Sequence, residues 1–341
     1  MSDKLNVGII GAGRIGRLHA EHLVRRIPQA NVVAIADIVL EAAQKCAAAL
    51  DIPAAVRDHR IIMENPEVEA VIICSSTDTH AQMMEEAAAA GKHIFCEKPI
   101  ALDLARIDEA LAAVEQAGVK LQVGFNRRFD ANFRRVQRAV AEGEIGQPHL
   151  LHIISRDPAP PPIEYIRVSG GIFLDMTIHD FDMARFLIGS EVEEIYAAGS
   201  VMVDPAIGEA GDIDTAVITL RFENGVVGTI DNSRQAAYGY DQRVEVFGSQ
   251  GSISVGNNYP NTATICNVHN IHRDLPFNFF MDRYIDAYVA EMEAFIGCVQ
   301  QNTEPPVTGQ DGRIPVVMGY AALKSYEENR PIKVSEISPV L

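Results

Sequence analysis

Residues 5–24 read LNVGIIGAGRIGRLHAEHLV, and this stretch decides the fold of the first half of the chain. The apolar run 5–10 is typical of a buried parallel strand, and it leads into Gly11, Gly13 and Gly16, which open a helix expected over 14–24. Gly11 would permit the tight turn, Gly13 would let a pyrophosphate approach the backbone, and Gly16 would let the helix pack closely on the strand. The helix N-terminus would offer N–H groups to the phosphates. We expect a dinucleotide site, the alternative being a glycine-rich turn without a cofactor.

A second apolar strand, 32–36, ends in Asp37, about twenty residues past the glycines. A carboxylate there can hold the ribose hydroxyls, and Ile38 and Val39, which follow it, offer no cation to a 2′-phosphate. We therefore expect NAD rather than NADP. The expected cofactor contacts are Gly11, Gly13, Arg14, Ile15, Gly16, Asp37, Ser75, Ser76, Thr77, His80, Glu97 and Lys98.

Strands and helices continue to alternate up to residue 123, which predicts a doubly wound parallel sheet. Helices are expected over 40–50, 80–90 and 103–117, and strands over 70–74, 93–96 and 120–123. Ligands of such sheets bind beyond the carboxyl ends of the strands, where Ser75–Thr77 and Glu97-Lys98-Pro99 lie. Lys98, followed by a proline that can adopt a cis bond, is a candidate functional residue.

After residue 123 the pattern becomes that of an α+β domain with a large, mostly antiparallel, open sheet. Strands are expected over 148–155, 195–203, 214–222, 226–232, 242–247 and 252–255, and helices over 131–142, 288–299 and 314–329. Asn224-Gly225 is a hairpin signal. Val217, Val226 and Ile230 suggest an apolar outer face of the kind that forms oligomer contacts. We expect an NAD-binding Rossmann domain over 1–123 and a substrate and oligomerisation domain over 124–341, whose C-terminal helix can pack back on the first domain.

Residues 170–182 read GGIFLDMTIHDFD and are the expected catalytic segment. If they open one helix, Asp175, His179 and Asp182 fall at i, i+4 and i+7, on one face. A carboxylate one turn from an imidazole fixes its tautomer and raises its basicity, as general-base catalysis requires. The alternative is a solvated helix face with an acidic first turn.

Composition narrows the classes of function. A chain of 341 residues favours two domains, and a formal charge of −17 argues against nucleic acid or an anionic membrane as partner. The five cysteines are scattered and form no CxxC pair, so we expect neither a disulfide framework nor a zinc-cysteine site. Without a signal-peptide pattern or an apolar run approaching ~20 residues, a cytoplasmic protein is expected.

Several motifs together resemble the Gfo/Idh/MocA oxidoreductases, and the likeness covers almost the whole chain. These motifs are the GxGxxG ending at Gly16, CEKP at 96–99, GFNRRFD at 124–130 and GGxxxDxxxHD from 170. Within the family, FNRRFD and the YGYD at 238–241 look most like the inositol 2-dehydrogenases. The resemblance implies catalytic roles for Lys98, Asp175 and His179, and a homotetramer, which we expect to form through the open sheet face. The stretch Ser155-Arg156-Asp157-Pro158 departs from relatives that carry histidine and asparagine nearby.

The expected reaction is NAD-dependent oxidation of a secondary alcohol of an uncharged cyclic polyol to a ketone. The resemblance narrows the substrate to myo-inositol, giving 2-keto-myo-inositol. His179 is the expected base, Asp175 its orienting partner and Lys98 the cation on the reacting oxygen, although Lys98 could itself be the base. The expected substrate contacts are Lys98, Arg127, Asp157, Asp175, His179 and Tyr238.

Four alternatives stay open. Scyllo-inositol, or an aldose or pyranose, could be the substrate within the same family. An NAD-binding sensor would keep the glycines and dispense with Lys98, Asp175 and His179. A metal-dependent enzyme is disfavoured because no second histidine stands at ligand spacing near His179.

Overall fold

The computed structural model describes residues 4–337, which divide into two compact units. One unit comprises the chain up to Asn126 together with Asp286–Ile314, and the other comprises Arg127–Ile285 together with the chain from Pro315. The change of unit after Asn126 lies three residues beyond the expected boundary. The expectation that all residues after 123 belong to the second domain is wrong, because 286–314 return to the first unit.

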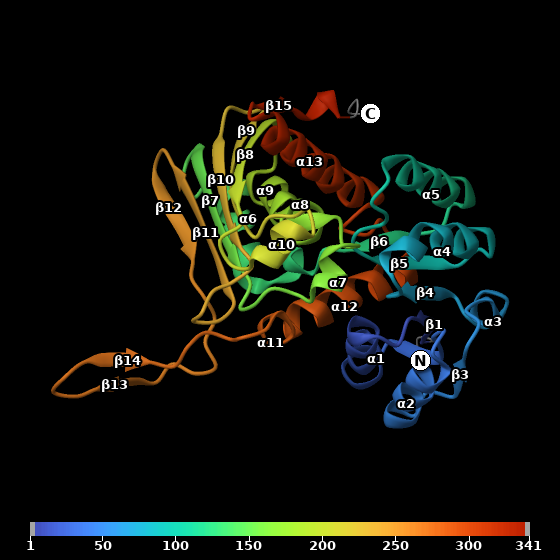
Figure 1. The fold of residues 1–341 in the computed structure, drawn as a ribbon. Coiled ribbons are helices and arrows are strands. Elements are labelled where there is room, and N and C mark those ends of the chain that lie inside the picture. Colours follow the sequence, from blue (N-terminus) through green and yellow to red (C-terminus); the bar gives the residue numbers. More distant parts are fainter. Residues whose placement is uncertain (1–3, 338–341) are drawn as a thin grey trace. The chain divides into compact units, whose positions relative to one another are not determined.

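The first unit is built on a six-stranded, all-parallel sheet in the order β3-β2-β1-β4-β5-β6, which confirms the predicted Rossmann fold (Figure 1). Its strands are β1 (Leu5–Ile10), β2 (Ala30–Ala36), β3 (Ala54–Val56), β4 (Ala70–Ile73), β5 (His93–Glu97) and β6 (Leu121–Gly124). Its helices are α1 (Arg14–Arg26), α2 (Leu40–Leu50), α3 (Arg60–Met63), α4 (Thr77–Ala89), α5 (Leu104–Ala117) and α12 (Ile285–Gln301). The order reverses between β1 and β4, the position at which ligands of this fold bind.

Helix α12 joins the first unit because its apolar face completes that unit's core. Val289, Met292, Phe295 and Ile296 pack in one cluster with residues of β1, β2 and β4. Gln122 Nε2 of β6 donates to the backbone oxygen of residue 291 at 2.8 Å. The C-terminal helix α13 (Gly309–Glu328) is divided between the units after Ile314.

The second unit holds a seven-stranded mixed sheet in the order β12-β11-β7-β10-β9-β8-β15. Its strands are β7 (Pro148–Arg156), β8 (Val192–Ser200), β9 (Thr215–Phe222), β10 (Val227–Ser233), β11 (Asp241–Gly248), β12 (Gly251–Val255) and β15 (Ile332–Lys333). Its helices are α6 (Ala131–Ala141), α7 (Ile163–Ile166), α8 (Gly171–Asp175), α9 (Ile178–Ile188), α10 (Pro205–Glu209) and α11 (Phe280–Arg283), and short 3₁₀ helices cover Asn126–Phe129 and Val334–Glu336. All neighbours pair antiparallel except β7 and β10, which are parallel, so the prediction of a mostly antiparallel open sheet is confirmed.

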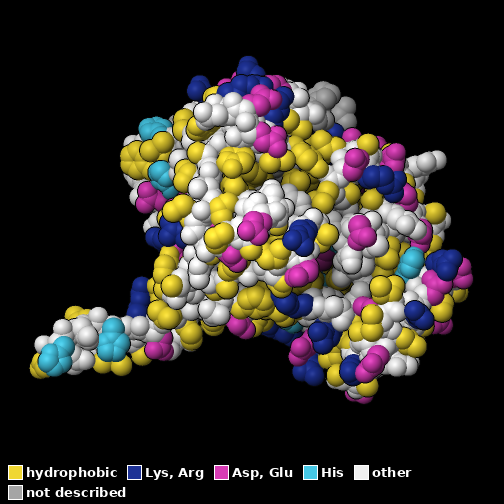
Figure 2. All heavy atoms as spheres, in the orientation of Figure 1, with side chains coloured by type: hydrophobic (Ala, Val, Ile, Leu, Met, Phe, Trp, Pro, Cys, Tyr) yellow, Lys and Arg dark blue, Asp and Glu magenta, His cyan; other side chains and the backbone are white. Residues whose placement is uncertain are grey.

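The sheet of the second unit carries helices on one face and leaves the other face open (Figure 1). Val217 is 51% exposed on the open face, as predicted, but Val226 and Ile230 are buried, so their assignment to the outer face is wrong. In β10 the side chains alternate, and Val227 rather than Val226 is exposed. A hairpin of β13 (Thr264–Cys266) and β14 (Ile271–Arg273) extends from the sheet as an arm with apolar and histidine side chains on its surface (Figures 1 and 2).

The expected catalytic helix is interrupted. Helix α8 ends at Asp175 and α9 begins at Ile178, so the i, i+4, i+7 face predicted for one continuous helix does not form. Thr177, at the break, donates from Oγ1 to the Ile172 carbonyl at 3.2 Å and to Asn232 Oδ1 at 2.6 Å. No helix within residues 4–337 has the length and apolar character needed to cross a membrane.

Candidate active site

The glycine-rich turn has the geometry that the sequence predicts. Gly11 has φ +102°, and a Cβ there would lie 2.5 Å from the Cys74 carbonyl oxygen. A Cβ on Gly16 would overlap the Gly11 carbonyl oxygen, so the helix can approach the turn only without a side chain. Gly13 is exposed, and a Cβ there would have no atom within 4 Å. A pyrophosphate can therefore reach the backbone at Gly13 and the start of α1, where Arg14 and Ile15 lie.

Asp37 is tied to the glycine-rich turn. Its Oδ2 accepts from the Ala12 backbone N–H at 2.7 Å, and its Oδ1 accepts from the Val39 N–H at 2.8 Å. The side chain remains partly exposed just beyond β2. Each carboxylate oxygen has a second lone pair that can accept a ribose hydroxyl.

The loop after β4 contains exposed groups and one buried histidine. Ser76 is exposed and precedes α4, and Ser75 and Thr77 are half-buried. His80 is buried, with Nδ1 2.9 Å from the Pro99 carbonyl and Nε2 3.0 Å from the Ser75 carbonyl. Both ring nitrogens face backbone oxygens, so His80 joins the two loops that follow β4 and β5.

The segment after β5 presents Lys98 and turns Glu97 inward. Lys98 is half-buried, and its peptide bond to Pro99 is cis, as the sequence suggested. Glu97 Oε1 lies 2.7 Å from His19 Nε2 of α1. The Glu97 carboxyl group, expected to contact the cofactor, is thus engaged with the interior of the first unit.

In the second unit, Asp175 is the centre of a polar cluster. Its Oδ1 accepts from the Tyr165 hydroxyl at 2.8 Å, and its Oδ2 accepts from Arg234 Nη1 at 3.2 Å. Burial and the Asp175 carboxylate raise the pKa of Tyr165, so this hydroxyl keeps its proton and donates. Arg234 is buried and also donates to Asp212 at 3.3 Å. His179 is half-buried in the first turn of α9.

Asp157, just beyond β7, belongs to the same cluster. Burial raises the pKa of its carboxyl group to about 6, and the Asp175 carboxylate acts in the same direction, while Arg234 and Arg127 oppose them. The backbone fixes its position, because its N–H donates to the Ser233 carbonyl at 2.9 Å and its carbonyl accepts from the Ala236 N–H at 2.7 Å. The cluster therefore offers two neighbouring carboxyl groups.

Arg127 lies in a buried network instead of standing ready for a substrate anion. Its Nη1 donates to Asp180 Oδ1 at 2.6 Å and its Nη2 to the Tyr240 hydroxyl at 3.2 Å. Asn232 donates to Asp180 Oδ2 at 2.9 Å. Asp180 is thus the direct ion-pair partner of Arg127, whereas Asp157 interacts with Arg127 only through its charge.

Asp182 is also committed to structure. The single N–H of Arg128 Nε is shared between its two carboxylate oxygens at 3.0 Å each, and Nη2 donates to Oδ1 at 2.6 Å. The side chain is buried, and this pair holds α9 on the segment before α6. Asp182 therefore does not lie on a shared catalytic face, because Arg128 binds it elsewhere.

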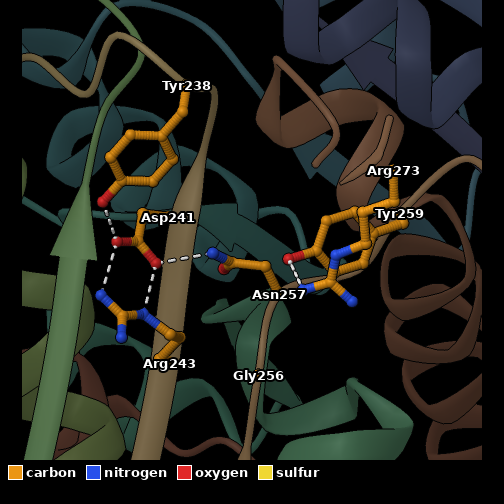
Figure 3. Close-up of a pocket in the computed structure, with 7 residues that line it drawn as sticks. All are labelled: Tyr238, Asp241, Arg243, Gly256, Asn257, Tyr259 and Arg273. Carbon is orange, nitrogen blue, oxygen red and sulfur yellow. Dashed lines mark hydrogen bonds and ion pairs between the residues drawn. The ribbon is translucent and has the colours of Figure 1, made fainter. Parts of the chain in front are cut away.

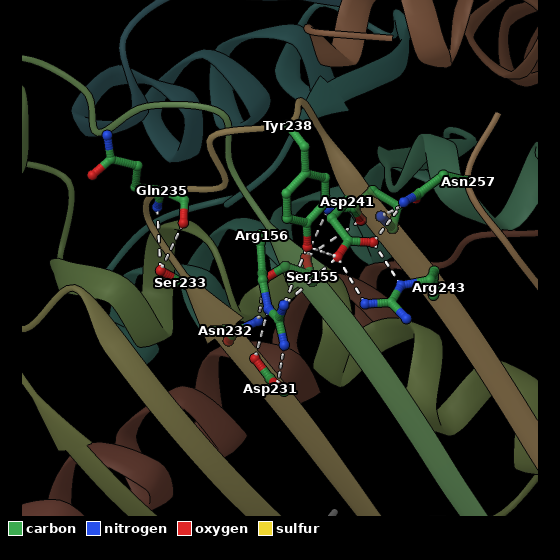
Figure 4. A network of polar contacts seen from close by, with 11 residues as sticks. Ser155, Arg156, Asp231, Asn232, Ser233, Gln235, Tyr238, Asp241, Arg243 and Asn257 are labelled. Atoms are coloured by element: carbon green, nitrogen blue, oxygen red, sulfur yellow. Dashed lines mark hydrogen bonds and ion pairs between the residues drawn. The ribbon is translucent and has the colours of Figure 1, made fainter. Parts of the chain in front are cut away.

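Tyr238 joins a different network, at the open face of the sheet. Its hydroxyl donates to Asp241 and accepts from Arg156 Nη1 at 3.2 Å (Figure 4). Arg156 also pairs with Asp231, with Nε 3.0 Å from Oδ1. A pocket of about 420 Å³ adjoins this network (Figure 3), lined by Tyr238, Asp241, Arg243, Gly256, Asn257, Tyr259 and Arg273. The structure therefore groups Tyr238 apart from Asp157 and Asp175.

The known proteins to which this chain is similar decide its family. A model described as oxidoreductase family, NAD-binding Rossmann fold, matches residues 5–125, and the GFO/IDH/MocA C-terminal domain matches residues 133–254. The chain is 50% identical over 333 residues to the myo-inositol 2-dehydrogenase of Thermotoga maritima, which covers 98% of this chain and 99% of that protein. The chain belongs to the Gfo/Idh/MocA oxidoreductase family.

Two further members of the Gfo/Idh/MocA family extend the comparison. The inositol 2-dehydrogenase of Rhizobium meliloti is 44% identical over 328 residues, which are 96% of this chain and 98% of that one. The structure of scyllo-inositol dehydrogenase from Lactobacillus casei with NAD(H) and scyllo-inositol superposes with a TM-score of 0.91 at 30% identity, covering 98% of this chain and 100% of that chain. The predictions of an oxidoreductase and of an NAD cofactor are confirmed, and the exposed Gly13 and the half-buried Asp37 fit that cofactor.

Sequence reasoning missed three residues of this Gfo/Idh/MocA site: Tyr165, Arg234 and Asn232. One signal was available for Asn232, which alternates with Ile230 on the buried face of a predicted strand, where an amide needs partners. Arg234 follows that strand with no local pattern to mark it. Tyr165 reaches Asp175 only through the fold.

Proposed function

We propose that the protein oxidises myo-inositol to its 2-ketone with NAD. One observation carries the proposal: Asp157 and Asp175 lie together, while the arginines beside them, Arg127 and Arg234, are paired with other groups as well. Carboxylates accept hydrogen bonds from hydroxyls, and guanidinium groups already paired bind an anionic substrate weakly. The cluster thus favours a neutral polyol over a phosphorylated or acidic sugar.

The proposal gives each polar side chain a task. NAD, when bound, supplies the hydride acceptor. His179 takes the hydroxyl proton, and Lys98 donates a hydrogen bond to the reacting oxygen, where negative charge develops. Asp175, held by Tyr165 and Arg234, is the orienting partner of His179 in this proposal. In a second version Lys98 takes the proton itself, its charged form disfavoured beside a cationic ring.

The stereochemistry follows from the substrate ring. Carbon 2 of myo-inositol bears the axial hydroxyl, so its hydrogen is equatorial and can be directed at the nicotinamide. Scyllo-inositol has no axial hydroxyl. The relatives named for myo-inositol or inositol at 50% and 44% identity support myo-inositol, whereas two relatives named for scyllo-inositol stand at 36% and 30%.

Steady-state kinetics test this proposal. With saturating NAD, kcat/KM is measured by NADH absorbance for myo-inositol, scyllo-inositol, glucose and an inositol phosphate. We expect myo-inositol to exceed scyllo-inositol and glucose by about tenfold or more, since one mispaired hydroxyl costs at least about 1.4 kcal/mol. Preference for scyllo-inositol, or activity with the phosphate alone, would overturn the proposal.

We also propose a cytoplasmic homotetramer that forms through the open sheet face. Leu150, Val217, Val227 and Phe247 are each at least 40% exposed on that face, and apolar patches of this kind mark protein contacts. Light scattering after size-exclusion chromatography measures the mass. Val217→Asp should lower it, whereas Met202→Asp, at an exposed loop position, should not. A monomeric wild-type protein would refute the tetramer.

A further inference from the structure

Three titratable side chains from distant parts of the sequence meet inside the first unit. They are His19 of α1, Glu97 at the end of β5 and Glu291 of α12, and one ligand-type atom from each lies within 4.8 Å of the others. His19 and Glu291 are fully buried, and the Glu97 side chain is 13% exposed. The reaction proposed above uses none of the three.

His19 and Glu97 are directly paired. His19 Nε2 lies 2.7 Å from Glu97 Oε1, and because a carboxylate only accepts, Nε2 carries the hydrogen. The ring makes edge contacts with Phe95 and Tyr288, at centroid distances of 5.2 and 5.6 Å. A Cβ at residue 124 would lie 2.9 Å from Glu97 Oε2, so Gly124 leaves room for the carboxylate. Glu97 thus has a fixed position.

The carboxyl group of Glu291, unlike that of Glu97, is not paired in the described structure. Neither of its carboxyl oxygens has a hydrogen-bond partner among the described residues. Burial raises the pKa of Glu291 well above its usual value, and the like charge of Glu97 acts in the same direction. An ionised carboxylate buried without a partner costs several kcal/mol or more, on the order of a strongly destabilising substitution. A proton removes most of that cost.

Among the described residues, burial keeps the neighbouring titratable groups neutral, and it lowers the pKa of His22, which interacts with His19, to about 4. Burial raises the pKa of the two thiols of Cys74, after β4, and Cys96, in β5, and the charge of Glu97 acts in the same direction. Both thiols therefore stay neutral. Tyr288, one turn before Glu291 on α12, contributes a ring edge to His19.

We propose that Glu291 is a neutral carboxylic acid in the native protein, and that its proton binds Glu97 when the two carboxyl groups, whose nearest ligand atoms lie within 4.8 Å of one another in the structure, move into hydrogen-bond distance. His19, Glu97 and Glu291 would then form one hydrogen-bonded group. Gln122 fixes the backbone of residue 291 from β6. The group therefore ties α1, β5, β6 and α12 together at the strand end that continues into Lys98. Glu291 is a positioning residue for Lys98, and this last step rests on the proposed function of Lys98.

A divalent cation is the competing reading, because one imidazole and two carboxylates are also ligands for a metal. The two readings differ in what a direct measurement finds. Metal analysis of the purified protein, with and without chelator treatment, should find no bound ion in the proposed state. One ion per chain, bound by wild type and lost in Glu291→Gln, would overturn the proposal.

Infrared spectroscopy detects the proton itself. Wild-type protein labelled with ¹³C-glutamate should show a protonated-carboxyl C=O band that shifts with the label and persists at neutral pH. The band should be absent from Glu291→Gln and present in Glu293→Gln, which changes an exposed glutamate of the same helix. Absence of the band from wild type would refute the proposal, and this measurement requires no variant to fold.

Unfolding gives an independent test with a defined sign. A group whose pKa is raised on folding stabilises the protein below its unfolded pKa and loses that contribution as the pH rises through its folded pKa. The unfolding constant of wild type should therefore rise relative to that of Glu291→Gln by up to about tenfold per pH unit, beginning above the ordinary glutamate pKa of 4.5 and ending at the raised pKa of the folded state. Glu293→Gln should show no such trend. A pH-independent ratio for Glu291→Gln would contradict the proposal.

Enzyme kinetics test separately whether Glu291 positions Lys98. Glu291→Ala should lower kcat by about tenfold or more while the Kd for NAD changes little, and Glu291→Gln should recover most of kcat. Equal loss in both variants would overturn the positioning step. The infrared band and the unfolding trend do not depend on myo-inositol or on Lys98, so failure of the proposed function would leave them unchanged.

Discussion

Asp157→Asn should make the protein more stable and less active. The Asp157 pKa is about 6 in the folded protein against an ordinary value of 3.8, chiefly because of burial. The folded state thus holds this proton more tightly than the unfolded state. Protonated Asp157 makes its full contribution to the free energy of unfolding below pH 3.8. This contribution is lost as the pH rises to about 6.

The size of the effect follows from the shift. The pKa of Asp157 rises on folding from 3.8 to about 6, and each unit of pKa corresponds to ~1.36 kcal/mol. By neutral pH the wild type therefore loses about 3 kcal/mol of its free energy of unfolding, which the asparagine variant keeps. Asp157→Asn should therefore be up to about 3 kcal/mol more stable than wild type at pH 7, and similar to it near pH 4. Its kcat/KM for a polyol should fall by about a hundredfold, since an amide replaces a carboxylate acceptor.

Urea unfolding at several pH values, with parallel kinetics, measures both effects. The exposed Asp78→Asn variant is the control and should show neither effect. In wild type, kcat/KM should rise with pH through about 6 as Asp157 ionises. The pH profile of Asp157→Asn should lack this rise. A stability difference that does not change with pH would refute the reasoning.

Three further predictions concern the cofactor and the chemistry. Wild type should prefer NAD to NADP by about a hundredfold in kcat/KM, and Asp37→Ala should narrow this gap mainly by weakening NAD; equal use of both by wild type would contradict it. His179→Ala or Lys98→Ala should lower kcat by about a hundredfold while NAD binding by calorimetry persists, and near-normal turnover in both would remove the site. Gly16→Ala should weaken NAD binding, measured by fluorescence titration, by about tenfold or more, because its methyl group overlaps the Gly11 carbonyl; unchanged affinity would count against this geometry.

Local patterns predicted most of the fold. The strand expected over 148–155 is observed as Pro148–Arg156, and the helix over 131–142 as Ala131–Ala141. The short elements β3 and α3 were not predicted, because a run of three or four residues shows too little hydrophobic periodicity. The return of α12 to the first unit could not be foreseen, since an apolar helix face does not say which core it joins.

Local sequence patterns also could not predict how the side chains of the site are arranged. Periodicity extended one helix through 170–182, whereas Thr177 bonds to Asn232 of a distant strand and the helix breaks there. The ion pairs of the cluster join Arg127 to Asp180 and Arg234 to Asp175, which lie far apart in the sequence. Only tertiary packing decides which charges are neutralised.

The late return of α12 has a consequence for synthesis. The ribosome completes β1 to β6 by Gly124, but Val289, Met292 and Phe295 of their core are translated more than 160 residues later. At about 5–20 residues per second the nascent sheet waits roughly ten seconds or more with this apolar surface uncovered. The emerging chain therefore exposes apolar surface that chaperones can bind during that interval, and fragments that end before α12 should aggregate, unlike the finished polypeptide.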